Sequence, residues 1–223
     1  MNRYDLVCAD MAGTTVADDG VVEQAASAAL EEHGLSRGAA EHDAAMTYVR
    51  DTMGQSKIEV FRAILHDESA AQGANRSFET AFEDLARAGK ITALPGAEDV
   101  LRRLRENGVK TALTTGFAPS TQAAILEALG WRNLVDLAVA PADGLRGRPF
   151  PDMVLHAVLR LSVDDVRRVA VVGDSANDIR SGLRAGAGLV AGVLTGAHDA
   201  AALREAGATH ILDSVAQLPS ALA

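Results

Sequence analysis

The stretch that decides the fold is residues 6–15, LVCADMAGTT, in which a short apolar run ends at Asp10 and a turn of small residues follows. Apolar runs of this length indicate a buried strand. Asp10 alone could be an ordinary turn residue. The same arrangement returns at residues 171–178, VVGDSAND, where a second apolar run ends at Asp174. Neighbouring parallel strands end at one edge of a sheet, so we expect both carboxylates there.

Working outward, the chain alternates such runs with amphipathic helical patterns that end at glycine. Alternation at crossover spacing predicts an α/β fold with a doubly wound, mostly parallel sheet covered on both faces, whose ligands bind beyond the carboxyl ends of the strands. The predicted strands are residues 6–9, 111–113, 134–140, 169–172, 189–194 and 211–212. The clearest helical patterns between them are residues 99–106, 122–129 and 179–185.

The interval 20–90 contains no convincing strand, and we interpret it as an inserted all-helical cap. This divides the chain into a core of residues 1–19 and 91–223 and a cap of residues 20–90. The helical patterns of the cap cover residues 22–32, 41–53, 58–65 and 78–88, and residues 67–77 are polar enough to suggest a surface loop. Asp18-Asp19-Gly20 would form the incoming border, and Pro95-Gly96 would close the outgoing one.

Composition narrows the function classes. With 223 residues and 48% hydrophobic content, the chain can bury a sizeable core. The net charge of −9 argues against a nucleic-acid or anionic membrane partner, since both require a basic face. The single cysteine, Cys8, excludes an internal disulfide and is expected to be a buried core residue. No run has the length of a membrane span, so we expect a cytoplasmic protein.

An acidic protein that binds a phosphate-like anion needs a local cation, metal or helix N-terminus. Close carboxylates such as Asp10 and Asp174 need neutralising, and an oxygen-rich site of this kind suits Mg²⁺. Ser175 could cap the next helix and place Asp178 in its first turn, in a supporting position. Thr115 and the amide of Gly116 follow another predicted strand, as in a phosphate clamp, although a capping threonine is an alternative.

Arg148 lies in the stiff loop Gly147-Arg148-Pro149-Phe150-Pro151, where a guanidinium could pair with a phosphoryl group and the nucleophile. A surface arginine is the equal alternative on this loop alone.

In this order along the chain, Asp10, Thr115, Arg148 and the Asp174/Asp178 pair resemble the four motifs of the haloacid dehalogenase superfamily, over the whole core. The resemblance implies a Rossmann-like core and an aspartyl-phosphate formed on Asp10. It also implies Mg²⁺ held by the Asp10 carboxylate, the Ala12 backbone carbonyl and Asp174, with support from Asp178.

Most phosphatases of the superfamily carry a second Asp two residues after the nucleophile, where this chain has Ala12. Alanine cannot shuttle protons. Together with Arg148, Ala12 resembles the phosphonatase branch, which cleaves a carbon-phosphorus bond after a cap lysine forms a Schiff base with the substrate. Met53-Gly54-Gln55-Ser56-Lys57 resembles the lysine segment of that branch, with Met53 and Gly54 at the substrate. The branch has a histidine where this chain has Val60.

Local chemistry supports Lys57. Ser56 and Glu59 have the spacing of a capping box, which would make Lys57 the first residue of a helix. The positive end of the helix dipole should then lower the pKa of its amine, as a nucleophile requires. A solvated lysine at a helix start is the alternative. The nearest histidines that could replace the missing one are His42 and His66, and no motif places either.

Our first hypothesis is a Mg²⁺-dependent, phosphonatase-like hydrolase of a small 2-oxoalkylphosphonate, with Asp10 as nucleophile and Lys57 as Schiff base. The alternative is a small-molecule phosphomonoesterase working through an aspartyl-phosphate, with Lys57 merely contacting substrate. A phosphoacceptor signalling module would also place an Asp and Mg²⁺ at a sheet edge, but it needs no cap. A homodimer is left open.

Overall fold

The computed structural model describes residues 3–17, 19–142 and 144–223, and its centre is a six-stranded sheet. The strands are β1 (Leu6–Asp10), β2 (Lys110–Thr114), β3 (Leu137–Val139), β4 (Val169–Gly173), β5 (Leu189–Val193) and β6 (His210–Leu212). Their order is β3-β2-β1-β4-β5-β6, and all neighbours pair in parallel. The predicted α/β fold is confirmed. β1 lies at the switch point, with β2 on one side and β4 on the other, where ligands bind in such sheets.

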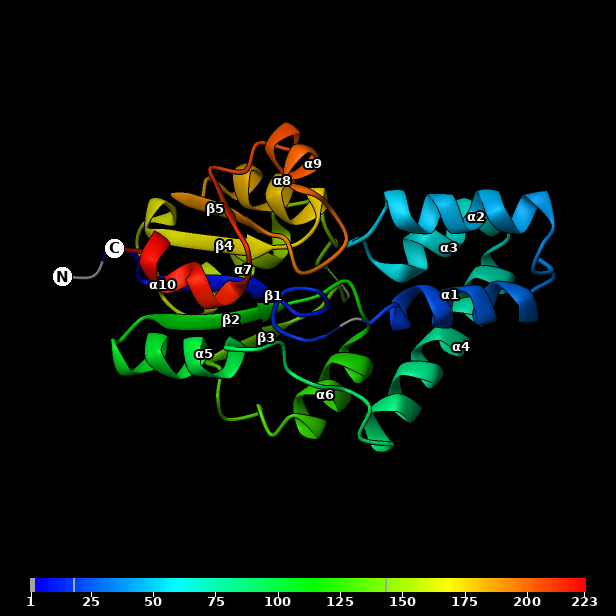
Figure 1. Ribbon diagram of the computed structural model, residues 1–223, viewed down its shortest axis with the longest axis horizontal. Helices are drawn as coiled ribbons and strands as arrows, with labels where there is room; N and C mark the ends of the chain where they lie inside the picture. Colours follow the sequence, from blue (N-terminus) through cyan, green and yellow to red (C-terminus); the bar gives the residue numbers. More distant parts are fainter. Residues whose placement is uncertain (1–2, 18, 143) are drawn as a thin grey trace.

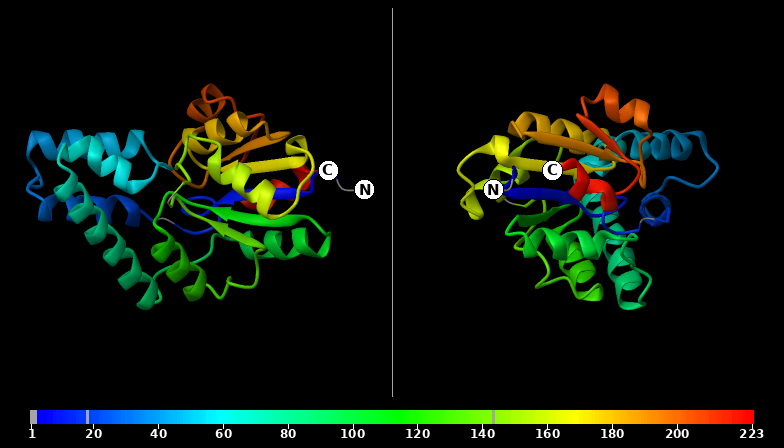
Figure 2. Two further views of the ribbon diagram at one scale, coloured as in Figure 1. Left: turned by 180° about the vertical axis from the view of Figure 1, so that it is seen from behind. Right: turned by 60° about the vertical axis from the view of Figure 1, so that its left-hand side comes forward.

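Helices cover both faces of this sheet (Figures 1 and 2). The helices of the core are α5 (Ala97–Glu106), α6 (Pro119–Ala128), α7 (Asp152–Arg160), α8 (Ala176–Ala185), α9 (Ala200–Glu205) and α10 (Leu218–Ala221), with 3-10 turns at Val166–Arg168 and Val215–Gln217. Val7 of β1 packs in one cluster with α5, and Leu6 packs in another with α7. Burial on both faces explains why the strands are apolar runs rather than alternating patterns.

Cys8 is a core residue, as expected. It is 1% exposed in β1, and burial raises the pKa of its thiol to about 12. The strand predicted over residues 134–140 is shorter than expected, because it covers only Leu137–Val139. The amide of Leu134 instead donates to the carbonyl of Trp131, which holds residues 131–134 in a turn beneath the buried indole.

Four helices stand beyond the carboxyl ends of the strands: α1 (Val21–Glu32), α2 (Ala40–Asp51), α3 (Lys57–Leu65) and α4 (Glu68–Arg87) (Figure 1). They occupy the interval 20–90, and the division of the chain into core and cap at these borders stays a prediction. Asp18 of the predicted incoming border lies outside the described residues. The two connections run side by side, since the amide of Ala17 donates to the carbonyl of Thr92 (2.9 Å).

The predicted loop at residues 67–77 is wrong, because this segment forms the first half of α4. Asp67 caps the helix by accepting a hydrogen bond from the amide of Ala70 (2.7 Å). The only apolar positions of the segment are small, and Ala71 and Ala74 are fully buried. α4 contacts α1 in the structure. Close helix packing needs small side chains, so the segment has too few large apolar residues to show helical periodicity.

A cluster of aromatic rings joins these helices to the sheet. Phe61 of α3 and Phe78 and Phe82 of α4 pack together, and Phe117, which follows β2, adds a ring from the core. The ring centroids of Phe82 and Phe117 are 4.7 Å apart. Aromatic pairs at such distances contribute beyond their buried area, so this cluster fixes α3 and α4 above the strand ends.

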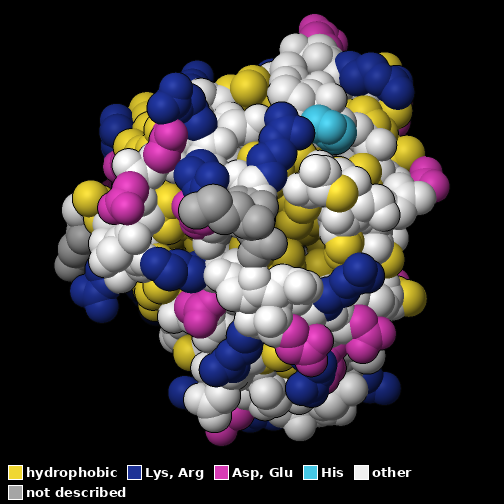
Figure 3. Space-filling model, turned by 90° about the vertical axis from the view of Figure 1, so that its left-hand side faces the viewer, with side chains coloured by type: hydrophobic (Ala, Val, Ile, Leu, Met, Phe, Trp, Pro, Cys, Tyr) yellow, Lys and Arg dark blue, Asp and Glu magenta, His cyan; other side chains and the backbone are white. Residues whose placement is uncertain are grey.

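The face at the amino ends of the strands carries Lys, Arg, Asp and Glu side chains interspersed with apolar ones (Figure 3). Among the helices of the described residues, none combines the length and the apolar character needed to cross a membrane.

Candidate active site

Three buried carboxylates meet at the carboxyl edge of the sheet. Asp10 ends β1, Asp174 directly follows β4, and Asp178 lies in the first turn of α8. One oxygen from each lies within 4.8 Å of the others. The sequence prediction that two strands bring carboxylates to one edge is thus confirmed, because β1 and β4 are paired neighbours.

Asp178 is fixed by the helix that carries it. Ser175 Oγ accepts a hydrogen bond from the amide of Asp178 (3.3 Å), and Asp178 Oδ2 accepts from the amide of Ser175 (3.1 Å). This reciprocal capping confirms the predicted cap at Ser175 and satisfies two amides of the helix end.

Arg148 connects two of the carboxylates. It comes from the loop between β3 and α7, and its side chain is only 3% exposed. Its Nη1 lies 2.7 Å from Asp10 Oδ1 and its Nε 2.8 Å from Asp178 Oδ1. Its Nη2 donates to Thr114 Oγ1 (2.6 Å). Sequence reasoning assigned no role to Thr114; its place at the end of β2, opposite Asp10, comes from the strand register.

The cluster holds excess negative charge, because three carboxylates share one guanidinium. Burial, more than any neighbour, raises the pKa of Asp10 well above its usual range. Burial and the charge of Asp178 raise the pKa of Asp174 to about 7. Buried carboxylates that resist ionisation favour a divalent cation with oxygen ligands.

The Asp174 carboxylate is closely surrounded by backbone groups and a hydroxyl. Its Oδ2 accepts from the amide of Ala197 (2.7 Å), and its Oδ1 is 3.4 Å from Thr14 Oγ1. A Cβ at Gly13 would lie 2.6 Å from Asp174 Oδ2, and one at Gly196 would lie closer still. The backbone therefore approaches this carboxylate more closely than any side chain would allow, and the donor set fits a small hard cation.

Asp10, Asp174 and Arg148 line a small cavity that residues of α1, of α3 and of the turn before α3 also line. The lining residues are Asp10, Ala12, Val22, Met53, Gly54, Lys57, Thr115, Gly116, Phe117, Arg148, Asp174 and Ala197. Every predicted site residue except Asp178 lies on this wall, and Asp178 stands behind it, bound to Arg148. The structure thus brings the predicted residues together, while their roles stay predictions.

Lys57 is the first residue of α3, as predicted, and is 6% exposed. Its Nζ lies 5.9 Å from the ring centroid of Phe78. The capping box predicted from Ser56 and Glu59 is wrong, because the Ser56 side chain makes no cap hydrogen bond. Glu59 pairs instead with Arg62 on the helix surface, since the next turn of α3 offers it a cation at hydrogen-bond distance.

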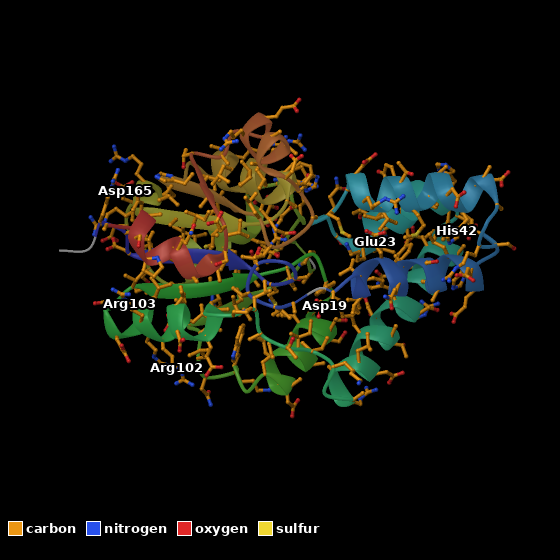
Figure 4. All side chains as sticks on the ribbon, viewed as in Figure 1. Asp19, Glu23, His42, Arg102, Arg103 and Asp165 are labelled. Atoms are coloured by element: carbon orange, nitrogen blue, oxygen red, sulfur yellow. The ribbon has the colours of Figure 1, made fainter. Side chains whose placement is uncertain are left out.

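The two candidate histidines lie away from the cavity. His42 lies in α2, among the outer helices, and its Nε2 is 3.0 Å from Ser27 Oγ (Figure 4). His66 ends α3 with a left-handed backbone. Val60 is buried in the hydrophobic core. Among the described residues that line the cavity there is no histidine.

A larger cleft of about 890 Å³ lies between α3, the first half of α4 and the loop residues 141–142 and 144–150. Arg148 lines both hollows. Sequence reasoning gave no sign of this cleft, because it forms between segments far apart in the chain.

The parallel sheet, with buried carboxylates and a small cavity at the carboxyl ends of its strands, has the architecture of an α/β enzyme. The chain belongs to the haloacid dehalogenase-like hydrolases, whose family model matches residues 4–186.

Two proteins with sequences similar to this chain are named phosphonoacetaldehyde hydrolase. The chain is 30% identical over 216 residues to the phosphonoacetaldehyde hydrolase of Bordetella pertussis, covering 78% of this chain and 77% of that enzyme. It is 30% identical over 157 residues to that of Parabacteroides distasonis, where it spans only 58% of the relative's length and 59% of its own. A solved phosphonoacetaldehyde hydrolase-like protein from Oleispira antarctica superposes with a TM-score of 0.83 at 24% identity, over 99% of this chain and 91% of that one.

Proposed function

We propose that this hydrolase cleaves the carbon-phosphorus bond of a small 2-oxoalkylphosphonate, with Asp10 as the nucleophile and Lys57 as a Schiff-base residue. The observation that carries the proposal is the chemistry of the cavity wall. Ala12 has no acid, and the described lining offers no histidine and no carboxylate beyond Asp10 and Asp174. A leaving group that finds no proton donor needs an electron sink instead, and Lys57 is the one amine on this wall among the described residues.

Asp10, the Ala12 carbonyl and Asp174 would hold Mg²⁺, with Asp178 in support. The cation would supply Lewis-acid stabilisation of negative charge on the phosphoryl oxygens. Arg148 and the hydroxyl of Thr115 would bind the same oxygens, together with the amide of Gly116. Met53 and Gly54 would contact the organic part of the substrate. These groups surround one cavity, which supports a common substrate.

In the proposed reaction, neutral Lys57 Nζ attacks the substrate carbonyl, and water leaves as the iminium forms. A carboxylate oxygen of Asp10 then bonds to phosphorus while the carbon-phosphorus bond breaks. The electron pair of that bond passes to the iminium, which becomes an enamine. Water hydrolyses the aspartyl-phosphate to inorganic phosphate, and protonation and hydrolysis of the enamine release the carbonyl product and restore Lys57.

The names of the relatives give independent support. The two relatives described above are both called phosphonoacetaldehyde hydrolase, at 30% identity. Phosphonoacetaldehyde is the simplest 2-oxoalkylphosphonate, which makes it the first substrate to test.

A phosphate-release screen tests this function. Phosphonoacetaldehyde, longer 2-oxoalkylphosphonates and common phosphate monoesters are each assayed with Mg²⁺ and with EDTA, for the wild type and Lys57→Arg. Lys110→Arg serves as the matched control, because Lys110 lies on β2 and binds the Leu161 carbonyl away from the cavity. We expect Mg²⁺-dependent release from the carbonyl phosphonates that Lys57→Arg abolishes. Release from esters alone, unchanged in Lys57→Arg, would establish the phosphomonoesterase alternative.

A further inference from the structure

The segment Met53–Lys57, which joins α2 to α3, is bound to the core at its first residue by a side chain outside the predicted site. Asn177 Nδ2 donates to the carbonyl of Met53 (2.7 Å). Asn177 lies in the first turn of α8, beside Asp178, and is 2% exposed. A carbonyl only accepts, so the amide nitrogen must face it.

The other end of the segment is bound to a different core loop. The amide of Lys57 donates to the carbonyl of Gly116 (3.3 Å). Between the two ends, Arg148 Nη1 lies 3.4 Å from the carbonyl of Gly54. The segment is thus suspended between the loop after β2 and the first turn of α8.

The segment packs so closely against the start of α8 that its backbone conformation at Gly54 is restricted. Gly54 has a left-handed backbone (φ +83°), and a Cβ there would lie 2.3 Å from Ser175 Oγ and 3.5 Å from Asn177 Cβ. The turn therefore lies directly on the first residues of α8. Without the Asn177 amide, the buried Met53 carbonyl would lose a neutral donor in a place that water reaches poorly.

We propose that Asn177 is a positioning residue that holds the Met53–Lys57 segment on the core and thereby sets where Lys57 stands over the cavity. The inference rests on the proposed function for the role of Lys57, but the holding of the segment is independent of it. The first turn of α8 then supports both parts of the site, because Asp178 binds Arg148 and Asn177 binds the Met53–Lys57 segment.

The test compares Asn177→Ala and Asn177→Ser with Ser181→Ala. Ser181 is the matched control, because it lies on the same helix, is buried and donates to a backbone carbonyl, that of Phe150 in a core loop (2.8 Å). Asn177→Ser keeps a polar side chain in case the alanine variant folds poorly. Amide hydrogen exchange is measured at Gln55 and Lys57, followed by kcat and KM on whichever substrate the wild type turns over.

We expect both Asn177 variants to exchange the Gln55 and Lys57 amides about threefold to tenfold faster, the factor that one net hydrogen bond provides. On a carbonyl phosphonate, kcat should fall by about tenfold or more while KM changes by less, because the contacts of Met53 and Gly54 loosen but those of Thr115 with the phosphoryl group stay. Ser181→Ala should change neither quantity.

Wild-type exchange rates in both Asn177 variants would overturn the proposal, and so would faster exchange with unchanged kcat. The exchange measurement needs no substrate. If the wild type forms no lysine adduct on borohydride reduction, the proposed function fails, while exchange still decides whether Asn177 holds the segment.

Discussion

Replacing Arg148 by methionine should destabilise the metal-free protein strongly. The substitution keeps much of the side-chain volume but removes the charge that faces Asp10 and Asp178 at 2.7 and 2.8 Å. Breaking a buried ion pair by removing one partner costs about 3–5 kcal/mol, because the remaining charge is left uncompensated. At pH 8 we therefore expect the free energy of unfolding to fall by about that amount in EDTA.

Mg²⁺ should restore part of the stability that Arg148→Met loses. Removal of the guanidinium leaves the carboxylates more negative, so the cation should bind the variant more tightly. A tenfold gain in affinity adds about 1.4 kcal/mol of stability when the cation is in excess. The loss measured with Mg²⁺ should therefore be smaller than the loss in EDTA by about 1 kcal/mol or more.

Urea unfolding followed by circular dichroism measures both quantities. Arg132→Met is the control, since Arg132 pairs with Glu127 at the surface, where the two side chains are 58% and 71% exposed. Exposed pairs contribute little, so this variant should unfold almost as the wild type does, with or without Mg²⁺. The reasoning is refuted if Arg148→Met loses no more than the control, or if Mg²⁺ leaves its loss unchanged.

Two further predictions follow from the same site. Because the folded-state pKa of Asp174 is raised to about 7, by burial and by Asp178, the stability of the metal-free protein should fall as pH rises from about 4 through 7. The Mg²⁺-induced rise in Tm should therefore be larger at pH 8 than at pH 5.5, and equal rises would contradict this. Gly54→Ala should lose activity and more stability than Gly38→Ala in thermal unfolding, because both have positive φ but only Gly54 has Ser175 against it; equal losses would count against the close packing.

Much of the fold was predictable because its signals are local. The central strands β1, β4 and β5 are buried along their whole length, so they appear as apolar runs, and α5, α6 and α8 each end next to or shortly before a glycine. Asp10 and Asp174 were predictable together, because parallel strands must end at one edge. The first half of α4 was not predicted. The alanines that it buries, Ala71 and Ala74, are small, so the segment shows no pattern of large apolar side chains at helical spacing.

The contacts that assemble the site were less predictable, since many of them end on backbone atoms. Asn177 binds a carbonyl 124 positions earlier in the chain, and a backbone acceptor leaves no mark on the sequence. The pairing of Arg148 with Thr114 needed the register of β2 against β1, which the apolar pattern alone does not give. The capping box predicted at Ser56 was wrong although Ser56 and Glu59 have the right spacing, because Glu59 pairs with Arg62 instead.

The most direct test of the account is borohydride reduction during turnover of phosphonoacetaldehyde, followed by mass spectrometry of the peptides. We predict a stable alkyl adduct on Lys57 that requires substrate and is absent from Lys57→Arg. Release of phosphate from phosphonoacetaldehyde with no adduct on Lys57 would contradict the Schiff-base mechanism.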